Sequence, residues 1–443
     1  MTIRIYQDID LARREVLRRR MFEDVEVSPA VQRGLDRVFG EGTTPVQAVE
    51  RIIAEVRQRG DDALHDYSRT IEGVELDAIE VSEDELGDAL HALDPELRSA
   101  LELAAERIER FHTKQTRQSW VDWSDEGALG QIVMPLDRVG IYVPGGTAPL
   151  PSSLLMAAIP ARVAGVNDLI VCAPPQRDTG RVAPLILAAA HIAGIRRVFQ
   201  VGGAQAIAAM AYGTASLPRV DKIVGPGNIF VVLAKRAVYG VVDIESLPGP
   251  TETVVIADRF ADAGLAAADL LAQAEHDTIA SAILLTDSAD LATRVQAEVG
   301  RQLEELARAD IAALALEQRG GIVVTPTIEE AIGLANQYAP EHLCLLVADP
   351  WRYVGLVRNA GGIFLGERSF EVLGDYVAGP SHIMPTGGTA RYASPVNVDD
   401  FRKIISLVAL NDRALDRTGA AAARLAEAEG LTGHANAVRL RMK

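Results

Sequence analysis

Four of the eight histidines lie beside carboxylates, glycines or prolines, whereas the other four lie within helical patterns. A histidine in the first kind of position can exchange a proton near neutral pH or bind a metal ion through a ring nitrogen. The first candidates for an acid–base or metal site are therefore His276, His342, His382 and His434.

The segment LLAQAEHDT (270–278) places a glutamine and a histidine three residues apart. On a helix, Gln273 and His276 would share one face and could reach one ion together. An amide oxygen combined with imidazole nitrogens suits zinc or a similar divalent ion. An exposed polar helix end would give the same pattern, so the pair alone leaves both interpretations open.

The segment APEHLCLLV (339–347) places Glu341 and His342 at the start of an apolar strand, because Pro340 ends the helix before it. The imidazole is a natural proton acceptor, and the neighbouring carboxylate can activate water or act as a second base. A Glu-His pair at such a junction is otherwise common and often only structural.

Two later segments carry the remaining polar candidates. Asp375 and His382 lie in FLGERSFEVLGDYVAGPSHIMPT (364–386), a stretch too polar and irregular for a core. Irregular loops on α/β scaffolds often carry ligand contacts. In AEAEGLTGHANAV (426–438), Glu429 and His434 lie at and beyond a helix end that Gly430 terminates.

The chain has no G-x-G-x-x-G fingerprint of a dinucleotide site. Three shorter glycine turns remain, each directly after an expected strand: YVPGG (142–146), VGGAQA (201–206) and VGPGN (224–228). Such turns expose backbone N–H groups that can bind phosphates, and Asn228 can cap the helix that follows. Glycine turns serve packing as often as phosphate binding, so both interpretations stay open.

The elements that must position these residues alternate between strand and helix. Residues 1–125 are expected to be mostly helical, with apolar positions at helical spacing. From about residue 130, short β-branched runs alternate with helical stretches, which is typical of a parallel sheet. A second such series begins at TETVVIAD (251–258), and the chain beyond about residue 390 is expected to be helical again.

Composition narrows the classes of partner. The 443 residues include 44 Lys and Arg against 61 Asp and Glu, a net charge of −17. Nucleic acids and anionic membranes need a basic surface, so neither is expected as a partner. Two cysteines cannot form a disulfide framework or a thiolate metal site. The chain shows no signal-peptide pattern and no apolar run long enough to span a membrane, so we expect a cytoplasmic protein.

Long, ordered motifs make the sequence similar to the histidinol dehydrogenase family over nearly the whole chain, from VRQRGDDAL (56–64) to EGLTGHANAVRLR (429–441). The motifs that carry this resemblance include PLDRVGIYVPGG, VGGAQAIAAMAYGT, VDKIVGPGN, LLAQAEHD, YAPEHL, GDYVAG and SHIMPT. The resemblance implies oxidation of L-histidinol to L-histidine through L-histidinaldehyde. Two successive hydride transfers to NAD would complete this last step of histidine biosynthesis.

The resemblance also implies roles for the candidate residues. His342 would take the proton of the alcohol, and Glu341 would activate the water that attacks the aldehyde. One zinc ion per subunit would fix the substrate against the nicotinamide. The active unit would be a homodimer with shared sites, because one ligand would come from the partner subunit. The implied zinc ligands are Gln273, His276, Asp375 and the partner's His434.

Further residues match positions that contact the cofactor and the substrate in the family. The implied NAD contacts are Tyr142, Gln205 and Asn228, one in each glycine turn. Ser152 matches a further substrate-contacting position. The implied substrate contacts are Thr251, Gln273, His276, His342, Asp375, His382, Glu429 and His434.

In terms of fold, the resemblance implies an α/β protein with two incomplete Rossmann-like parallel-sheet domains, similar to aldehyde dehydrogenases, and small helical terminal segments. A first domain would carry most zinc and catalytic residues, and a second would bind NAD. The C-terminal segment would contribute to the partner's active site. The expected division is an N-terminal helical segment (1–30), the first domain (31–137 with 252–390), the second domain (138–251) and the C-terminal helical segment (391–443).

One departure from the family and three alternative functions remain to be considered. Many family members have serine where this chain has Thr251, and the added methyl group could tighten the substrate pocket. Relatives on this scaffold oxidise other small alcohols, such as 2,3-dihydroxypropane-1-sulfonate, although His382 and Glu429 favour histidinol. A zinc hydrolase would leave the glycine turns unexplained. In a non-catalytic ligand-binding protein, Glu341 and His342 would be structural.

Overall fold

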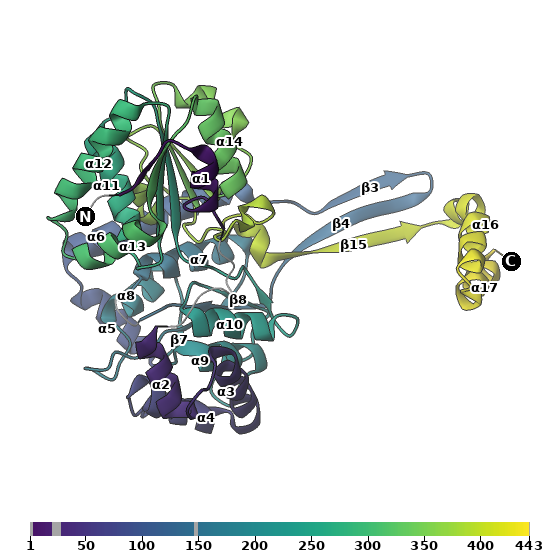
Figure 1. Ribbon diagram of the computed structural model, residues 1–443. Coiled ribbons are helices and arrows are strands. Elements are labelled where there is room, and N and C mark those ends of the chain that lie inside the picture. The colour runs from purple at the N-terminus through teal and green to yellow at the C-terminus, as the bar shows by residue number, and fades with distance from the viewer. Residues whose placement is uncertain (1–2, 20–27, 146–148, 443) are drawn as a thin grey trace.

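The computed structural model describes residues 3–19, 28–145 and 149–442. They form two six-stranded sheets, each packed on both faces, and a three-stranded sheet that extends from the body as an arm (Figure 1). The predicted α/β fold with two parallel sheets is confirmed. None of the described helices is long and apolar enough to cross a membrane.

The first sheet has the strand order β2-β7-β6-β5-β8-β9, with β2 antiparallel to β7 and the other neighbours parallel. The order reverses between β5 and β8, so the glycine turns that follow these strands open side by side. The strands are β2 (Glu80–Val81), β5 (Arg138–Tyr142), β6 (Asp168–Cys172), β7 (Arg197–Phe199), β8 (Lys222–Val224) and β9 (Asp243–Ile244). The connecting helices are α7 (Pro151–Ala164), α8 (Pro184–Ile192), α9 (Gly203–Tyr212) and α10 (Ile229–Val238).

The second sheet has the strand order β1-β12-β11-β10-β13-β14, and all neighbours are parallel. Its order reverses between β10 and β13. The strands are β1 (Ile5–Tyr6), β10 (Glu252–Ala257), β11 (Ser281–Thr286), β12 (Gly321–Val324), β13 (His342–Leu346) and β14 (Gly362–Leu365). The helices are α1 (Ile9–Arg14), α11 (Ala263–Ala274), α12 (Ala289–Leu303), α13 (Ala309–Arg319), α14 (Ile328–Tyr338) and α15 (Glu371–Tyr376).

The N-terminal part of the chain is divided differently from the expectation. The helices of residues 45–112 pack on the first sheet rather than joining residues 252–390. The apolar face of α3 lies against α9, and β2 extends the first sheet through β7. Residues 3–19 are not a separate helical segment, because β1 pairs with β12 at the edge of the second sheet. The helices of this part are α2 (Pro29–Phe39), α3 (Pro45–Arg59), α4 (Asp61–Tyr67), α5 (Glu83–Ala92) and α6 (Pro95–His112).

The arm joins two segments that the sequence analysis placed in different units. Strand β15 lies antiparallel to β4, which pairs in turn with β3. The expectation of a wholly helical C-terminal segment is therefore wrong for residues 402–410, whose β-branched run pairs with β4. Two helices form the far end of the arm (Figure 1). The elements are β3 (Trp120–Ser124), β4 (Gly127–Pro135), β15 (Arg402–Leu410), α16 (Asp412–Ala428) and α17 (Thr432–Arg441).

The turn after β8 leaves no room for a side chain at Gly225. Its φ of +127° lies in the left-handed region, and an added Cβ would collide with the carbonyl oxygen of Tyr142. We expect Gly225→Ala to lower the free energy of unfolding by about 3 kcal/mol, since it adds a clash with backbone to the φ penalty. Denaturant unfolding measures this loss.

Gly240 provides the matched control, because its φ is +98° but no atom lies within 4 Å of an added Cβ. Gly240→Ala should cost only the φ penalty of about 1 kcal/mol. Equal losses in the two variants would show that the clash at Tyr142 is relieved at little cost.

Candidate active site

The centre of the candidate site is the pair Glu341–His342 at the amino end of β13. His342 is the first residue of β13, and Thr251 directly precedes the neighbouring strand β10. The parallel register pairs Thr253 with His342, which brings the starts of the two strands together. Glu341 and His342 are only 7% and 4% exposed. The two side chains are thus held within the protein rather than at a surface loop.

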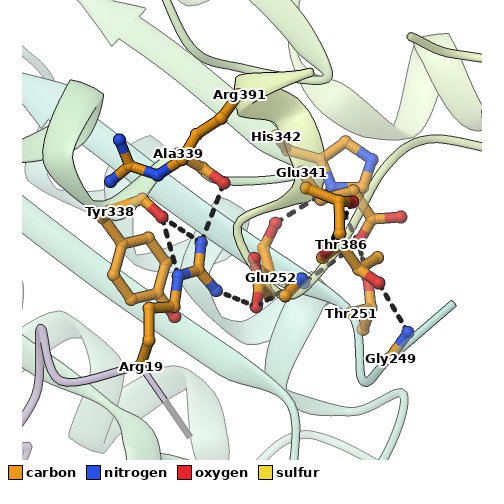
Figure 2. Close-up of polar contacts among 12 residues, drawn as sticks. Arg19, Gly249, Thr251, Glu252, Tyr338, Ala339, Glu341, His342, Thr386 and Arg391 are labelled. Atoms are coloured by element: carbon orange, nitrogen blue, oxygen red, sulfur yellow. Dashed lines mark hydrogen bonds and ion pairs between the residues drawn. The ribbon is translucent and has the colours of Figure 1, made fainter. Parts of the chain in front are cut away.

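Glu341 is fixed through one carboxylate oxygen. Its Oε2 accepts hydrogen bonds from the hydroxyl of Thr251 at 2.6 Å and from the backbone N–H of Glu252 at 3.0 Å (Figure 2). Burial raises the pKa of Glu341 to about 7, against the lowering effects of His342 and of these hydrogen bonds. A carboxyl group with this pKa can take a proton from water near neutral pH and release it again.

The ring of His342 is oriented by a backbone carbonyl. Its Nδ1 lies 3.2 Å from the carbonyl oxygen of Glu252, which can only accept, so Nδ1 carries hydrogen. Nε2 lies 3.7 Å from Oδ1 of Asp375 and has no hydrogen-bond partner among the described residues. Burial alone would lower the pKa of His342, but Glu341, Asp375 and Glu371 raise it to about 10. Since Nδ1 is held by the carbonyl of Glu252, Nε2 is the nitrogen left to exchange a proton with a ligand. A cation bound at Asp375 would offset the carboxylates and lower the pKa of His342 towards the neutral form that can accept a proton.

Gln273, in the last turn of α11, lies against this pair. Its amide oxygen accepts from the backbone N–H of Glu252 at 2.8 Å, and its amide nitrogen donates to Oε1 of Glu371 at 2.9 Å. The oxygen also lies against the hydroxyl of Thr251. The amide is thus fixed between strand β10 and helix α15, and its side chain is only 1% exposed.

His276 and Asp375 would offer a nitrogen and an oxygen donor to a cation. Burial lowers the pKa of His276 despite the opposing charge of Asp375, which keeps the imidazole neutral. Burial raises the pKa of Asp375, but the histidines around it, His342 first, lower it below its ordinary value. A neutral imidazole beside an ionised carboxylate is the form in which both bind a cation.

The donor set within the described residues is incomplete. No three His, Cys, Asp or Glu side chains in them are close enough to hold a metal ion together. Neither ring nitrogen of His276 has a hydrogen-bond partner in the described part of the chain. Gln273, His276 and Asp375 would supply zinc with oxygen, nitrogen and oxygen donors, provided that the amide oxygen of Gln273 leaves Glu252 and Thr251. A fourth donor would have to come from elsewhere.

His382 lies beside Asp375, as the sequence motifs suggested. Its Nδ1 lies 2.7 Å from the carbonyl oxygen of Asp375, and its Nε2 lies 3.1 Å from the hydroxyl of Ser153. Ser153, rather than Ser152, is therefore the serine that contacts His382. Because α7 carries Ser153, this contact joins the first sheet's helices to the candidate site.

Sequence reasoning missed Glu371, which is 1% exposed and lies one helical turn before Asp375. It accepts a hydrogen bond from the hydroxyl of Thr253 at 2.7 Å, in addition to the bond from Gln273. Burial raises the pKa of Glu371 to about 7. The signal in the sequence was the spacing of four residues between Glu371 and Asp375, which places both on one helix face.

A cavity of about 780 Å³ lies at the three glycine turns, and among the candidate zinc ligands only His276 lines it. The hydroxyl of Tyr142 accepts a hydrogen bond from the backbone N–H of Gly203 at 3.1 Å, which joins two of the glycine turns. Oε1 of Gln205 is buried and has no partner among the described residues. Gly146, the last residue of the first turn, lies outside the described residues. The residues that line the cavity include Tyr142, Gln205, Asn228 and His276.

Two predicted site residues lie far from this centre. Glu429 ends α16, and His434 belongs to α17 at the far end of the arm (Figure 1). Both are exposed. Within one chain, the structure does not bring them to Glu341 and His342.

Comparisons with known proteins agree with this arrangement. The sequence model described as histidinol dehydrogenase matches residues 40–442. The histidinol dehydrogenase of Deinococcus radiodurans is 55% identical over 431 residues, which cover 96% of this chain and 97% of that protein. That of Thermus thermophilus is 52% identical over 398 residues, which cover 90% and 95%.

A solved structure of the same family has the same fold. The crystal structure of histidinol dehydrogenase from Elizabethkingia anophelis matches with a TM-score of 0.90 at 34% identity, covering 100% of this chain and 98% of that chain. The aligned region includes the arm, because it covers 100% of this chain. Sequence and fold thus agree, and the chain belongs to the histidinol dehydrogenase family.

Proposed function

We propose that this protein oxidises L-histidinol to L-histidine through L-histidinaldehyde, in two hydride transfers to NAD at a zinc site. This is the last step of histidine biosynthesis, which we place in the cytoplasm. The observation that carries the proposal is the buried Glu341–His342 pair, with Nε2 of His342 free, in a chain that also has a cavity lined by three glycine turns and His276. Family membership favours this reaction over oxidation of another small alcohol, such as 2,3-dihydroxypropane-1-sulfonate.

His342 acts in the first oxidation. Its Nε2 takes the hydroxyl proton as the hydride leaves the carbinol carbon for the nicotinamide, which yields the aldehyde and NADH. The bond from Nδ1 to the carbonyl of Glu252 keeps this nitrogen directed at the substrate. After His342 releases this proton to solvent, the same base would take the hydroxyl proton of the hydrated aldehyde in the second oxidation.

Glu341 acts between the two oxidations. Its carboxylate takes a proton from the water that adds to the aldehyde carbon, which produces the hydrate. Thr251 and the backbone of Glu252 occupy its Oε2, so Oε1 is the oxygen available to water. The methyl group of Thr251 leaves this hydroxyl contact intact, which reconciles the threonine with the family's serine.

The NAD site is proposed at the turns after β5, β7 and β8. Tyr142, Gln205 and Asn228 line the same cavity, and the strand order reverses between β5 and β8. Ligands of parallel α/β sheets bind at such reversals, beyond the carboxyl ends of the strands. The buried, unpartnered Oε1 of Gln205 offers an acceptor to a ligand group.

Zinc, one ion per subunit, is proposed to lie on Gln273, His276 and Asp375, completed by the partner subunit's His434. Bound there, zinc would orient the substrate and polarise its hydroxyl group. The remaining substrate contacts are assigned to Thr251, His342 and His382 of one chain and to Glu429 of the other.

The arm supports the proposal of a homodimer with shared sites. Its sheet and helices expose large apolar side chains, with Trp123, Val408 and Leu425 at 78%, 67% and 65% exposure. Exposed apolar surface of this kind marks a protein–protein contact. If a second copy packed against the arm of the first, Glu429 and His434 on that arm would lie near Glu341 and His342 of the second copy.

The test is the yield of NADH from a limiting amount of L-histidinol, with and without a chelator. We expect two NADH for each histidinol, with loss of activity on chelation and recovery on addition of zinc. A yield of one NADH would contradict the role of Glu341. No NADH from a zinc-loaded dimer would overturn histidinol as the substrate.

A further inference from the structure

Arg19, from the N-terminal segment, uses all three of its guanidinium nitrogens to bind two segments of the active-site framework. Nε donates to the carbonyl of Tyr338 at 2.7 Å, and Nη2 donates to the carbonyls of Tyr338 and Ala339, the latter at 2.8 Å. Nη1 pairs with the carboxylate of Glu252 (Figure 2). The guanidinium also stacks on the ring of Tyr338, 3.6 Å from its centroid.

The first segment is the turn that introduces Glu341 and His342. Tyr338 is the last residue of α14, and the carbonyls at a helix end lack partners within the helix. Ala339 has a φ of +54° and is the only non-glycine residue of the described chain with positive φ. A side chain in this conformation is strained, so surrounding contacts must hold it there. Arg19 supplies those contacts two residues before Glu341.

The second segment is the start of β10, where Glu252 contacts both members of the pair. Its N–H donates to Glu341 at 3.0 Å, and its carbonyl accepts from Nδ1 of His342. Its carboxylate is buried and accepts from Arg19 and, at 3.2 Å, from the N–H of Gly387. One guanidinium therefore binds the turn that precedes Glu341 and the side chain of Glu252, whose backbone contacts both Glu341 and His342.

We propose that Arg19 is a positioning residue for Glu341 and His342, reaching the reaction only through the turn at Ala339 and through Glu252. The inference rests on the proposed roles of the pair. Displacement of catalytic groups by about 1 Å can slow a reaction by about 100-fold, so loss of Arg19 acts on turnover rather than on binding. NAD affinity is unaffected, because its proposed contacts belong to the first sheet.

Arg19 could also act only by stabilising the end of α14, where a cation is favourable. The chain contains a control for this alternative. Arg391 donates to the carbonyl of Gln337 in the same last turn of α14, but it does not reach Ala339 or Glu252. A residue that only stabilises this helix end should thus behave like Arg391. A positioning residue should differ from it in turnover.

The experiment compares Arg19→Ala, Arg19→Lys and Arg391→Ala as zinc-loaded dimers, with kcat and KM measured for histidinol and NAD. We expect Arg19→Ala to lose about 100-fold in kcat with KM for NAD within about twofold of the original. Lysine can pair with Glu252 but cannot also reach both carbonyls, so Arg19→Lys should lose about 10-fold. Arg391→Ala should change kcat by less than about twofold, as a surface contact does.

Chemical rescue separates positioning from folding. A cavity of about 320 Å³ borders Arg19, Glu252 and Tyr338, so a guanidinium ion can enter when the side chain is removed. Millimolar guanidinium chloride should restore kcat to Arg19→Ala, whereas sodium chloride should not. If Arg19→Ala does not fold, Arg19→Lys provides the test. It should lose kcat while its melting temperature stays unchanged.

Two results would overturn the inference. The first is a kcat of Arg19→Ala equal to that of the original protein. If only Arg19→Lys folds, the same result in Arg19→Lys would overturn the inference. The other is an equal loss in Arg391→Ala with no rescue by guanidinium. Absence of NADH formation by the unaltered protein is a different result, since it contradicts the proposed function and not the contacts of Arg19.

Discussion

His342→Ala is expected to slow both hydride transfers by about 1,000-fold, because it removes the base that takes the proton as each hydride leaves. Glu341→Gln is expected to retain the first transfer and to impair chiefly the oxidation of the aldehyde. Glutamine keeps the shape of Glu341 and can still accept from Thr251, but it cannot take a proton from water. The NADH yield per histidinol should thus fall from two towards one, with accumulation of L-histidinaldehyde.

Separate assays of the two half-reactions measure this division, one starting from histidinol and one from histidinaldehyde. His91→Ala is a suitable control, because His91 is exposed on α5 and bonds only to the carbonyl of Gly87 among the described residues. Equal losses in both half-reactions for Glu341→Gln would contradict a role confined to water activation. Little loss in either variant would make the protein a ligand-binding one.

Hybrid dimers should recover activity from two inactive variants. Gln273→Ala combined with His276→Ala removes ligands in the body of one chain, and His434→Ala removes the ligand on the arm of the other. A hybrid holds one site with an intact body and an intact arm. Random exchange of equal amounts makes half of the dimers hybrid, so about a quarter of the original activity should return.

The measurement is activity after mixing, with subunit exchange followed by mass spectrometry. Each variant alone, taken through the same treatment, gives the background. Exchange without recovery would mean that His434 serves its own chain, which would require the arm to fold back onto its own body. Recovery well above a quarter would mean that one of the two variants is not fully inactive.

The sequence predicts candidate site residues where the residues that act together are close in the chain. Gln273 and His276 lie three residues apart at the end of α11, and Pro340 precedes Glu341 and His342 at a strand start, so each pair is visible in a few adjacent letters. Glu371 was missed because its partners, Thr253 and Gln273, lie about 100 residues earlier. Arg19 was missed for the same reason, since its partner Glu252 is 233 residues away.

The fold shows the same limit. Hydrophobic periodicity indicated which face of α3 is apolar, but it cannot indicate which sheet covers that face. The helices of residues 45–112 were therefore assigned to the wrong sheet. The strand at residues 402–410 was missed because its pairing partner, residues 127–135, lies in a distant part of the chain. Both errors concern pairing across distance, which periodicity within one segment does not report.

The pairing of β15 with β4 has a consequence for synthesis of the chain. At about 5–20 residues per second, tens of seconds separate the emergence of β4 from that of β15. During that time one edge of β4 is unpaired, and an open strand edge is a template for association with other chains. A nascent chain thus passes through a stage at which mispairing competes with folding. Conditions that slow translation should therefore lower the yield of soluble protein more than its final stability would suggest.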